Sequence, residues 1–397
     1  MLRLSRWAGG HAWFAMVPLA TVAVVPLTAQ QSYGFVVRLG RDTIAIERVQ
    51  RSVDHLAGDV VERNPDVVIR HYDVRLAADG SVRRFVSDSK PGNPRPGQLP
   101  AQHVEIDFRP DSVRVAITAG GEVTVADFAT GGQLAMPWFA SAYGMSEQLL
   151  LAARERTGDT IPVILYLPTG HLAGIVRTYV RRYGPDSASI SYRDAPIMAQ
   201  LDWRGQIASL SGDRTTNKVH LTRQDLPPDI GAIAARFAAA EKAAGGPAEL
   251  SPRDTARGSV GGAVLMVDYG RPRLRGRTAI GTLVPLDSVW RTGANEATQF
   301  RTSAPISLAG IRLEPGRYTL WTKLTRGGPT LIVNRETGQW GTKYAAALDV
   351  ARAPLMAEAV DDPIEAFTIR IERTGNATGR LVMEWDRFRW TAEIVLK

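Results

Sequence analysis

Short alternating runs of apolar and polar residues, separated by turn residues, constrain the fold of this chain more than any other feature. They recur between Phe35 and Arg223, and the Asp79-Gly80 pair between two of them is typical of a tight hairpin. Because successive side chains of a strand point to opposite faces, the alternation predicts strands with one buried face. We therefore predict a strongly curved antiparallel sheet, which could curl into a half-barrel.

One segment inside this region has no turn residues and predicts a helix. Residues Ser146 to Arg156 are rich in Leu, Ala and Glu, which favour helices. A helix crossing a curved sheet can close the core on one face, so we expect it to lie in the concavity.

A second helix is expected where the strand pattern stops. Asp229 can cap a helix that continues through Lys242, and Gly245-Gly246-Pro247 ends it. We predict a first domain at residues 30–226, an alanine-rich helical linker at 227–262 and a second domain at 263–397. The alanine-rich helix could act as a tether, because few of its side chains are large enough to specify packing.

The second domain is again predicted as strands, with Ala279 to Val284 among them. In the last one, Trp390, Ala392, Ile394 and Leu396 share one face, which should be core. Short strands punctuated this regularly favour a β-sandwich or jelly roll. A short helix or long loop is expected between residues 339 and 360.

The first 29 residues resemble a cleaved signal peptide. Arg3 and Arg6 precede an apolar stretch from Trp13 to Val25, and small residues end at Ala29. The chain has no cysteine, which excludes disulfides, thiol nucleophiles and a lipid-modified N-terminal Cys. We predict an exported protein, periplasmic or extracellular, that is soluble after cleavage and has no transmembrane segment in the mature chain.

The net charge of +8 is spread along the chain without a block of Lys or Arg, so nucleic acid is not predicted as a partner. Motifs for phosphate loops, dinucleotide binding and common hydrolases are absent from the sequence, and no cofactor is predicted. The oligomeric state is left open.

Five ordered motifs carry a resemblance to a known family. They are Asp268-Tyr269-Gly270-Arg271-Pro272, Arg275-Gly276-Arg277, Val289 to Thr298, Pro315 to Leu320, and Gln339-Trp340-Gly341. In this order they resemble the bacterial family called domain of unknown function 2911, over roughly Leu250 to Lys397. The resemblance implies an exported bacterial β-domain and implies no activity.

The same motifs supply the candidate ligand site. Planar guanidinium groups bind carboxylate, phosphate or sulfate in a bidentate manner, and aromatic rings provide a stacking wall. The predicted site comprises Tyr269, Arg271, Arg277, Trp290, Arg291, Asn295, Glu296 and Trp340. The alternative is structural: Arg291 pairs with Glu296 to hold the loop, Asn295 caps a turn and Trp290 belongs to the core.

Two weaker hypotheses concern acidic residues. Glu384 and Asp386, two apart on one strand face, could share acid and base chemistry, with Glu296 as a further catalytic candidate. His103, Glu105 and Asp107 share one strand face and could hold a metal with help from a neighbouring strand carrying His71 and Asp73. In both cases the alternative is a solvated face.

The function predicted from the sequence is binding of a small polar or anionic ligand, such as a saccharide, by the C-terminal domain. Two alternatives stay open. One is a carbohydrate-active hydrolase or lyase, and the other is an envelope module that interacts with lipid or protein.

Overall fold

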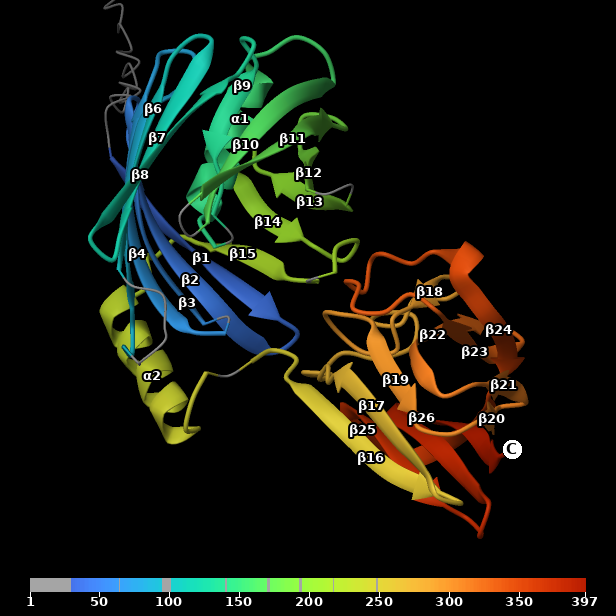
Figure 1. Ribbon diagram of the computed structural model, residues 1–397. Helices are drawn as coiled ribbons and strands as arrows, with labels where there is room; N and C mark the ends of the chain where they lie inside the picture. Colours follow the sequence, from blue (N-terminus) through green and yellow to red (C-terminus); the bar gives the residue numbers. More distant parts are fainter. Residues whose placement is uncertain are drawn as a thin grey trace, which may run out of the picture.

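The computed structural model describes residues 30–397, except 64, 95–100, 140, 170–171, 193–194, 217 and 248. The predicted signal peptide, residues 1–29, lies outside the described residues. Strands form most of the described chain, as one large curved sheet followed by two smaller sheets (Figure 1). The prediction of a mainly β fold is confirmed.

The large N-terminal sheet has fifteen strands. They are β1 (Gln31–Leu39), β2 (Asp42–Arg51), β3 (His55–Arg63), β4 (Val67–Leu76), β5 (Val82–Pro91), β6 (Gln102–Phe108), β7 (Ser112–Ala119), β8 (Glu122–Ala129), β9 (Leu134–Pro137), β10 (Thr160–Thr169), β11 (Leu172–Arg182), β12 (Ser187–Tyr192), β13 (Ala195–Leu201), β14 (Ile207–Ser211) and β15 (His220–Gln224). Their order is β8-β7-β6-β5-β4-β3-β2-β1-β15-β14-β13-β12-β11-β10-β9. Neighbours are antiparallel except β9 and β10, which the intervening helix α1 (Tyr143–Arg154) joins as parallel strands.

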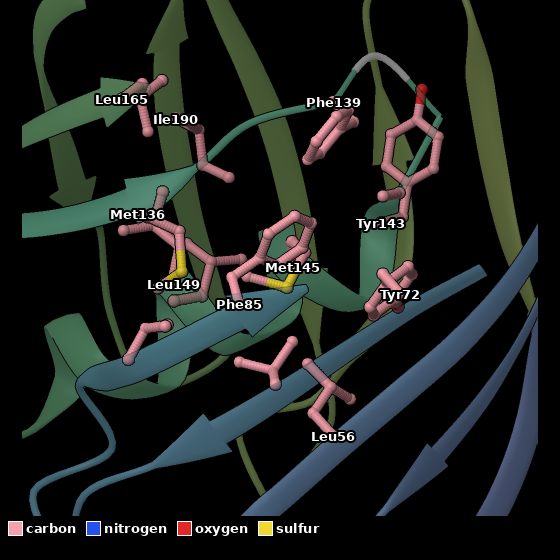
Figure 2. Packing of buried hydrophobic residues seen from close by; sticks show 14 of the residues in the cluster. Leu56, Tyr72, Phe85, Met136, Phe139, Tyr143, Met145, Leu149, Leu165 and Ile190 are labelled. Carbon is pink, nitrogen blue, oxygen red and sulfur yellow. The ribbon is translucent and has the colours of Figure 1, made fainter. Parts of the chain in front are cut away.

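Helix α1 lies in the concavity of this sheet, as predicted. Met145 and Leu149 on α1 are fully buried against Tyr72 and Phe85 of the sheet and other core side chains (Figure 2). The helix begins at Tyr143, three residues before the predicted start at Ser146, because the Glu47 side chain on β2 accepts hydrogen bonds from the first amides of the helix.

Helix α2 (Ile230–Ala243) starts at the predicted cap, where the Asp229 carboxylate accepts a hydrogen bond from the Ala232 amide at 3.0 Å. Its buried face, which includes Phe237, packs against Val61 and Val67 of the large sheet. The helix is therefore attached to the sheet by an apolar contact and is not the tether that its alanine-rich composition allowed. Within the described residues, neither helix is long and apolar enough to cross a bilayer.

The C-terminal strands form a sandwich of two sheets around one core. The strands of the larger sheet are β16 (Arg253–Val260), β17 (Ala263–Gly270), β18 (Val289–Trp290), β19 (Thr298–Thr302), β22 (Gly316–Thr325), β23 (Gly328–Asn334) and β24 (Asp349–Pro354); those of the smaller are β20 (Ile306–Leu308), β21 (Ile311–Leu313), β25 (Met356–Arg373) and β26 (Thr378–Leu396). On β26, Trp390, Ala392 and Ile394 are buried as predicted. Strand β16 occupies residues that we had predicted as linker.

Two local predictions in this part differ from the structure. The segment from Ala279 to Val284, predicted as a strand, is a tight turn: the Val284 amide donates to the Ala279 carbonyl at 2.7 Å, and Gly281 has a φ of +81°. Between residues 339 and 360 the structure has the short 3₁₀ helix η1 (Ala346–Leu348) and then β24, so the predicted short helix is present but is followed by a strand.

Candidate functional site

The loop between β18 and β19 adopts a conformation that few residues favour. Thr292 and Asn295 have φ values of +52° and +62° in the left-handed region. The Ala294 amide donates to the Gly270 carbonyl at 3.2 Å, and the Gly341 amide donates to the Asn295 carbonyl at 3.0 Å. Three motifs separated in sequence therefore meet at one packed corner.

Two glycines of these motifs are required by that packing. A Cβ atom on Gly270 would lie 2.0 Å from the Ala294 carbonyl oxygen. A Cβ atom on Gly341 would lie 2.1 Å from Arg291 Cδ and 2.5 Å from the Asn295 carbonyl oxygen. Only glycine fits such close approaches of backbone to backbone, so much of the motif pattern reflects construction of the loop.

The predicted stacking wall is mostly core. Trp290 is 6% exposed and packs among aromatic rings, with centroids 5.2 Å from Phe367 and 6.0 Å from Trp385. Tyr269 is 1% exposed, and its hydroxyl accepts a hydrogen bond from the Ile369 amide at 3.0 Å. Alternation along the strands does not distinguish a core ring from a pocket wall. Trp340, in contrast, is 45% exposed.

Glu296 and Arg271, both predicted as ligand-binding residues, form ion pairs within the protein. Glu296 forms an ion pair with Arg253, which also binds Asp268 at 2.9 Å. Arg271 forms an ion pair with Asp254 at 3.4 Å. The expected pair between Arg291 and Glu296 is not formed, because a guanidinium from β16 takes the carboxylate.

Arg291 is a half-buried arginine without an acidic partner among the described residues. Its Nη1 donates to the Asn295 carbonyl at 3.5 Å, and its buried Nε has no hydrogen-bond partner. Burial lowers the pKa of Arg291, because removal from water disfavours a cation. The side chain lies against Gly341, so its stem is held in place.

The N-terminal sheet and the C-terminal sandwich meet beside the loop between β18 and β19. At the turn between β1 and β2, the Arg41 amide donates to the Arg275 carbonyl at 2.8 Å. Arg275 is 7% exposed, and its Nε donates to Asp42 Oδ2 at 2.9 Å. The motif Arg275-Gly276-Arg277 therefore joins the C-terminal sandwich to the N-terminal sheet.

Lys218, between β14 and β15, brings a further cation to the junction. Burial is the largest influence that lowers the pKa of Lys218, and the nearby cations Arg277 and Arg291 lower it further, whereas Asp213 raises it. Burial and then the neighbouring Arg275 lower the pKa of Arg277. Lys218 therefore lies within electrostatic range of both Arg277 and Arg291.

The two candidate catalytic carboxylates of β26 are both engaged. Glu384 accepts hydrogen bonds of 2.6 Å from Arg370 and from Arg389. Burial raises the pKa of Glu384, but these two hydrogen bonds outweigh that effect and hold it below its usual value. Asp386 has a φ of +52° and accepts a hydrogen bond from the Ala279 amide at 2.8 Å. The strand bends at Asp386, so the pair does not lie on one regular face.

The predicted metal ligands are part of a charged ladder on the N-terminal sheet. His103 contacts Asp88 at 2.7 Å and Glu105 at 3.2 Å. Arg84 binds both Glu105 and Asp107 at 2.9 Å, so the carboxylates that would ligate a metal ion are already paired with a guanidinium group. Strand β4, expected to add ligands, is separated from β6 by β5. Among the described residues, no group of three His, Asp or Glu side chains is arranged to hold a metal.

Two residues of interest were not predicted from the sequence. The burial of Glu47, inside the N-terminal sheet, was predictable from the alternation of β2. Glu47 lies on the same strand face as the apolar residues Ala45 and Val49, so its side chain should point into the core. No sequence pattern could have predicted the role of Lys218, because its position near Arg277 depends on how the N-terminal sheet and the C-terminal sandwich meet.

The fold and site define a mainly β protein in which a curved sheet adjoins a β-sandwich with a cluster of cations at the junction. Residues 251–394 match the model of a family described as "Protein of unknown function (DUF2911)", which confirms the predicted resemblance for the C-terminal part. No curated protein matches the chain.

Two solved structures show similarity to this chain. One is a DUF1089 family protein from Pseudomonas aeruginosa, at 14% identity and a TM-score of 0.30, covering 52% of this chain and 95% of that chain. The other is a beta-barrel-like protein of domain of unknown function DUF1849 from Brucella abortus, at 13% identity and a TM-score of 0.32, covering 50% of this chain and 95% of that chain.

Proposed function

We propose that this chain is an exported bacterial binding protein for a small oxyanion, such as a sugar acid or a phosphate ester. The anion is bound by Arg291, Arg277 and Lys218 where the C-terminal sandwich meets the N-terminal sheet. The proposed site contains fewer of the residues that were predicted from the sequence. Tyr269 and Trp290 are assigned to the core, Arg271 and Glu296 to ion pairs, and Asn295 to the turn.

The unpaired guanidinium of Arg291 is the observation that carries the proposal. A buried cation is costly unless it is paired, and buried donors normally have partners. Arg291 has one hydrogen bond at 3.5 Å, and its buried Nε has no partner. An oxyanion would supply the missing acceptor and the missing charge, and the planar guanidinium suits carboxylate or phosphate.

The neighbouring cations strengthen this argument. Burial is the first cause of the lowered pKa of both Lys218 and Arg277, and neighbouring cations lower each pKa further: Arg277 and Arg291 act on Lys218, and Arg275 acts on Arg277. Asp213, the acid that acts on Lys218, is already hydrogen-bonded to His220 at 2.9 Å and to Ser211 at 2.8 Å. A bound anion would offset the repulsion that Lys218 experiences from Arg277 and Arg291.

The enzymatic alternative has less support. A general acid requires a carboxyl group that is protonated near neutral pH, and the lowered pKa of Glu384 favours the ionised form. The envelope alternative requires an apolar groove in the N-terminal sheet, whereas α1 packs buried apolar side chains against the concave face of that sheet (Figure 2).

Thermal unfolding of the mature chain at constant ionic strength tests the proposal. The probes are phosphate, sulfate, citrate, glucuronate and uncharged glucose. At least one oxyanion should raise the melting temperature of the wild type, glucose should not, and phosphate against glucuronate separates phosphate from carboxylate ligands.

Three single variants test whether the oxyanion that raises the melting temperature binds at Arg291 and Lys218. Arg291→Gln and Lys218→Gln should lose the shift, and the control Arg317→Gln should keep it, because Arg317 is an exposed arginine of the same sandwich. An equal shift in all four proteins, or a shift with none of the oxyanions, would refute the proposal.

A further inference from the structure

A second candidate site lies at the other end of the N-terminal sheet. A pocket of about 520 Å³ is formed where the β4–β5, β6–β7 and β8–β9 connections meet the residues that follow α1. Its lining includes Arg83, Arg109 and Arg156, and also Phe108 and Leu134. Ligand pockets of small molecules commonly have this size.

The position of this pocket separates it from the cation junction. Along the ladder, Arg51 pairs with Leu56, Leu56 with Val74, and Val74 with Phe85. The pocket is therefore level with the end of β2, whereas the junction lies at its start, beside the turn that contacts the C-terminal strands (Figure 1).

The charge of the pocket is unbalanced. Arg156 forms an ion pair of 3.6 Å with Asp79, and the hydrogen bond from the Ser81 hydroxyl is the first cause that lowers the pKa of Asp79. Arg83 and Arg109 are exposed, and neither side chain has an ion-pair or hydrogen-bond partner in the described part of the chain. Three guanidinium groups thus face one carboxylate, an excess that a ligand with two negative charges would neutralise.

The walls of the pocket are held in place before any ligand arrives. The Gln148 side chain of α1 donates to the Gly80 carbonyl at 2.7 Å, which ties the β4–β5 turn to the helix. The Thr130 amide donates to the Asp111 carbonyl at 2.7 Å, which ties the end of β8 to the β6–β7 turn. Preformed walls reduce the conformational entropy that binding costs.

We infer that this pocket binds an organic dianion with an apolar body. The charged end is bound by Arg83, Arg109 and Arg156, and the apolar body lies against Phe108 and Leu134. Both features are needed, because three cations without an apolar wall would bind inorganic phosphate equally well.

Calorimetric titration of the mature chain tests this with phenyl phosphate, phthalate, inorganic phosphate and benzyl alcohol as probes. Phenyl phosphate or phthalate should bind at least tenfold more tightly than inorganic phosphate, and benzyl alcohol should not bind. Phenyl phosphate against phthalate decides whether the charged group is a phosphate ester or a pair of carboxylates. The absence of binding by both aromatic dianions would overturn the inference.

Variants assign the binding to this pocket. Arg83→Gln/Arg109→Gln should weaken it at least tenfold while leaving the melting temperature unchanged, because both side chains are exposed and unpartnered. The control Arg114→Gln removes an exposed arginine from β7 that pairs with Asp127 outside the pocket, and should bind as the wild type does.

Arg291→Gln separates this inference from the proposed function. It should keep the phenyl phosphate binding that Arg83→Gln/Arg109→Gln weakens, because Arg291 does not line this pocket, whether or not the junction binds a second anion. Loss of affinity in Arg291→Gln with none in Arg83→Gln/Arg109→Gln would place the dianion at the junction and overturn the inference.

Discussion

The Tyr72 hydroxyl donates a hydrogen bond of 2.6 Å to the Glu47 carboxylate inside the N-terminal sheet. The same carboxylate accepts hydrogen bonds from the Tyr143 amide at 2.7 Å and the Gly144 amide at 3.1 Å, at the start of α1. Glu47 therefore joins β2, β4 and the helix inside the concavity, and it satisfies amides that a helix start otherwise leaves unpaired.

The titration of Glu47 should make the protein less stable as pH rises. Burial raises the pKa of Glu47 from 4.5 to about 8. Between these values the folded state holds a proton that the unfolded state has lost, so the free energy of unfolding falls as pH increases. At about 1.4 kcal/mol per pKa unit, the total is on the order of a few kcal/mol.

Glu47→Gln should reduce this pH dependence, because its amide resembles the protonated acid and does not titrate. Urea unfolding from pH 5 to pH 8.5 should show a smaller loss of stability in Glu47→Gln than in the wild type. The exposed Glu122→Gln serves as the control and should retain the wild-type profile. Parallel profiles for wild type and Glu47→Gln would contradict the assignment.

Removing a cationic partner of Glu147 should strongly destabilise the protein. Glu147 is fully buried and accepts hydrogen bonds from Arg223 at 2.7 Å, from the Ile207 amide at 2.8 Å and from the Tyr33 hydroxyl. It also forms a second, longer ion pair with Arg51 at 3.5 Å. Removing one partner of a buried ion pair costs about 3–5 kcal/mol, whereas replacing both can cost much less. Arg223→Met should therefore destabilise strongly, and Glu147→Leu/Arg223→Met should recover part of the loss in denaturant unfolding. Additive effects would show that the two residues are not coupled.

Gly341→Ala should destabilise the C-terminal sandwich by about 3 kcal/mol or more, because the contacts at 2.1 and 2.5 Å include backbone that cannot move cheaply. Gly327→Ala is the matched control, since its Cβ would meet Thr325 Oγ1 at an ordinary 3.5 Å. Thermal unfolding compares the two. A similar, small effect of both substitutions would mean that the motif corner is loosely packed.

The ion pair between Arg275 and Asp42 should couple the unfolding of the C-terminal sandwich to that of the N-terminal sheet. Arg275→Ala removes the side chain that joins the sandwich to the β1–β2 turn. Differential scanning calorimetry should then resolve two transitions or a broader one, and Asp42→Asn should have a similar, weaker effect. A single transition identical to the wild type in both variants would show that this contact does not link them.

The sequence was sufficient to predict the mainly β fold, because period-two alternation and turn residues are local signals. The start of α1 was not predictable at residue level, since it depends on Glu47, almost a hundred residues earlier. The segment from Ala279 to Val284 resembles a strand in composition, but backbone hydrogen bonds to Ala279 close it into a turn.

The candidate site was predicted only in part. Gly270, Arg291 and Gly341 belong to three of the five motifs that carried the family resemblance, and the structure packs these motifs at one corner. Alternation could not distinguish Trp290 in the core from Trp340 at the surface. Lys218 comes from the other part of the chain, and local pattern carries no information about such a contact.

Arg291→Met provides the most direct test of the proposed anion site. Methionine keeps the stem that packs against Gly341 and removes the unpaired charge, so without added oxyanion the variant should be as stable as the wild type or more stable. Calorimetric titration with citrate at constant ionic strength then decides the matter. The wild type should bind at one saturable site, and Arg291→Met at least tenfold more weakly. Equal affinity in the two proteins would contradict an anion site at Arg291.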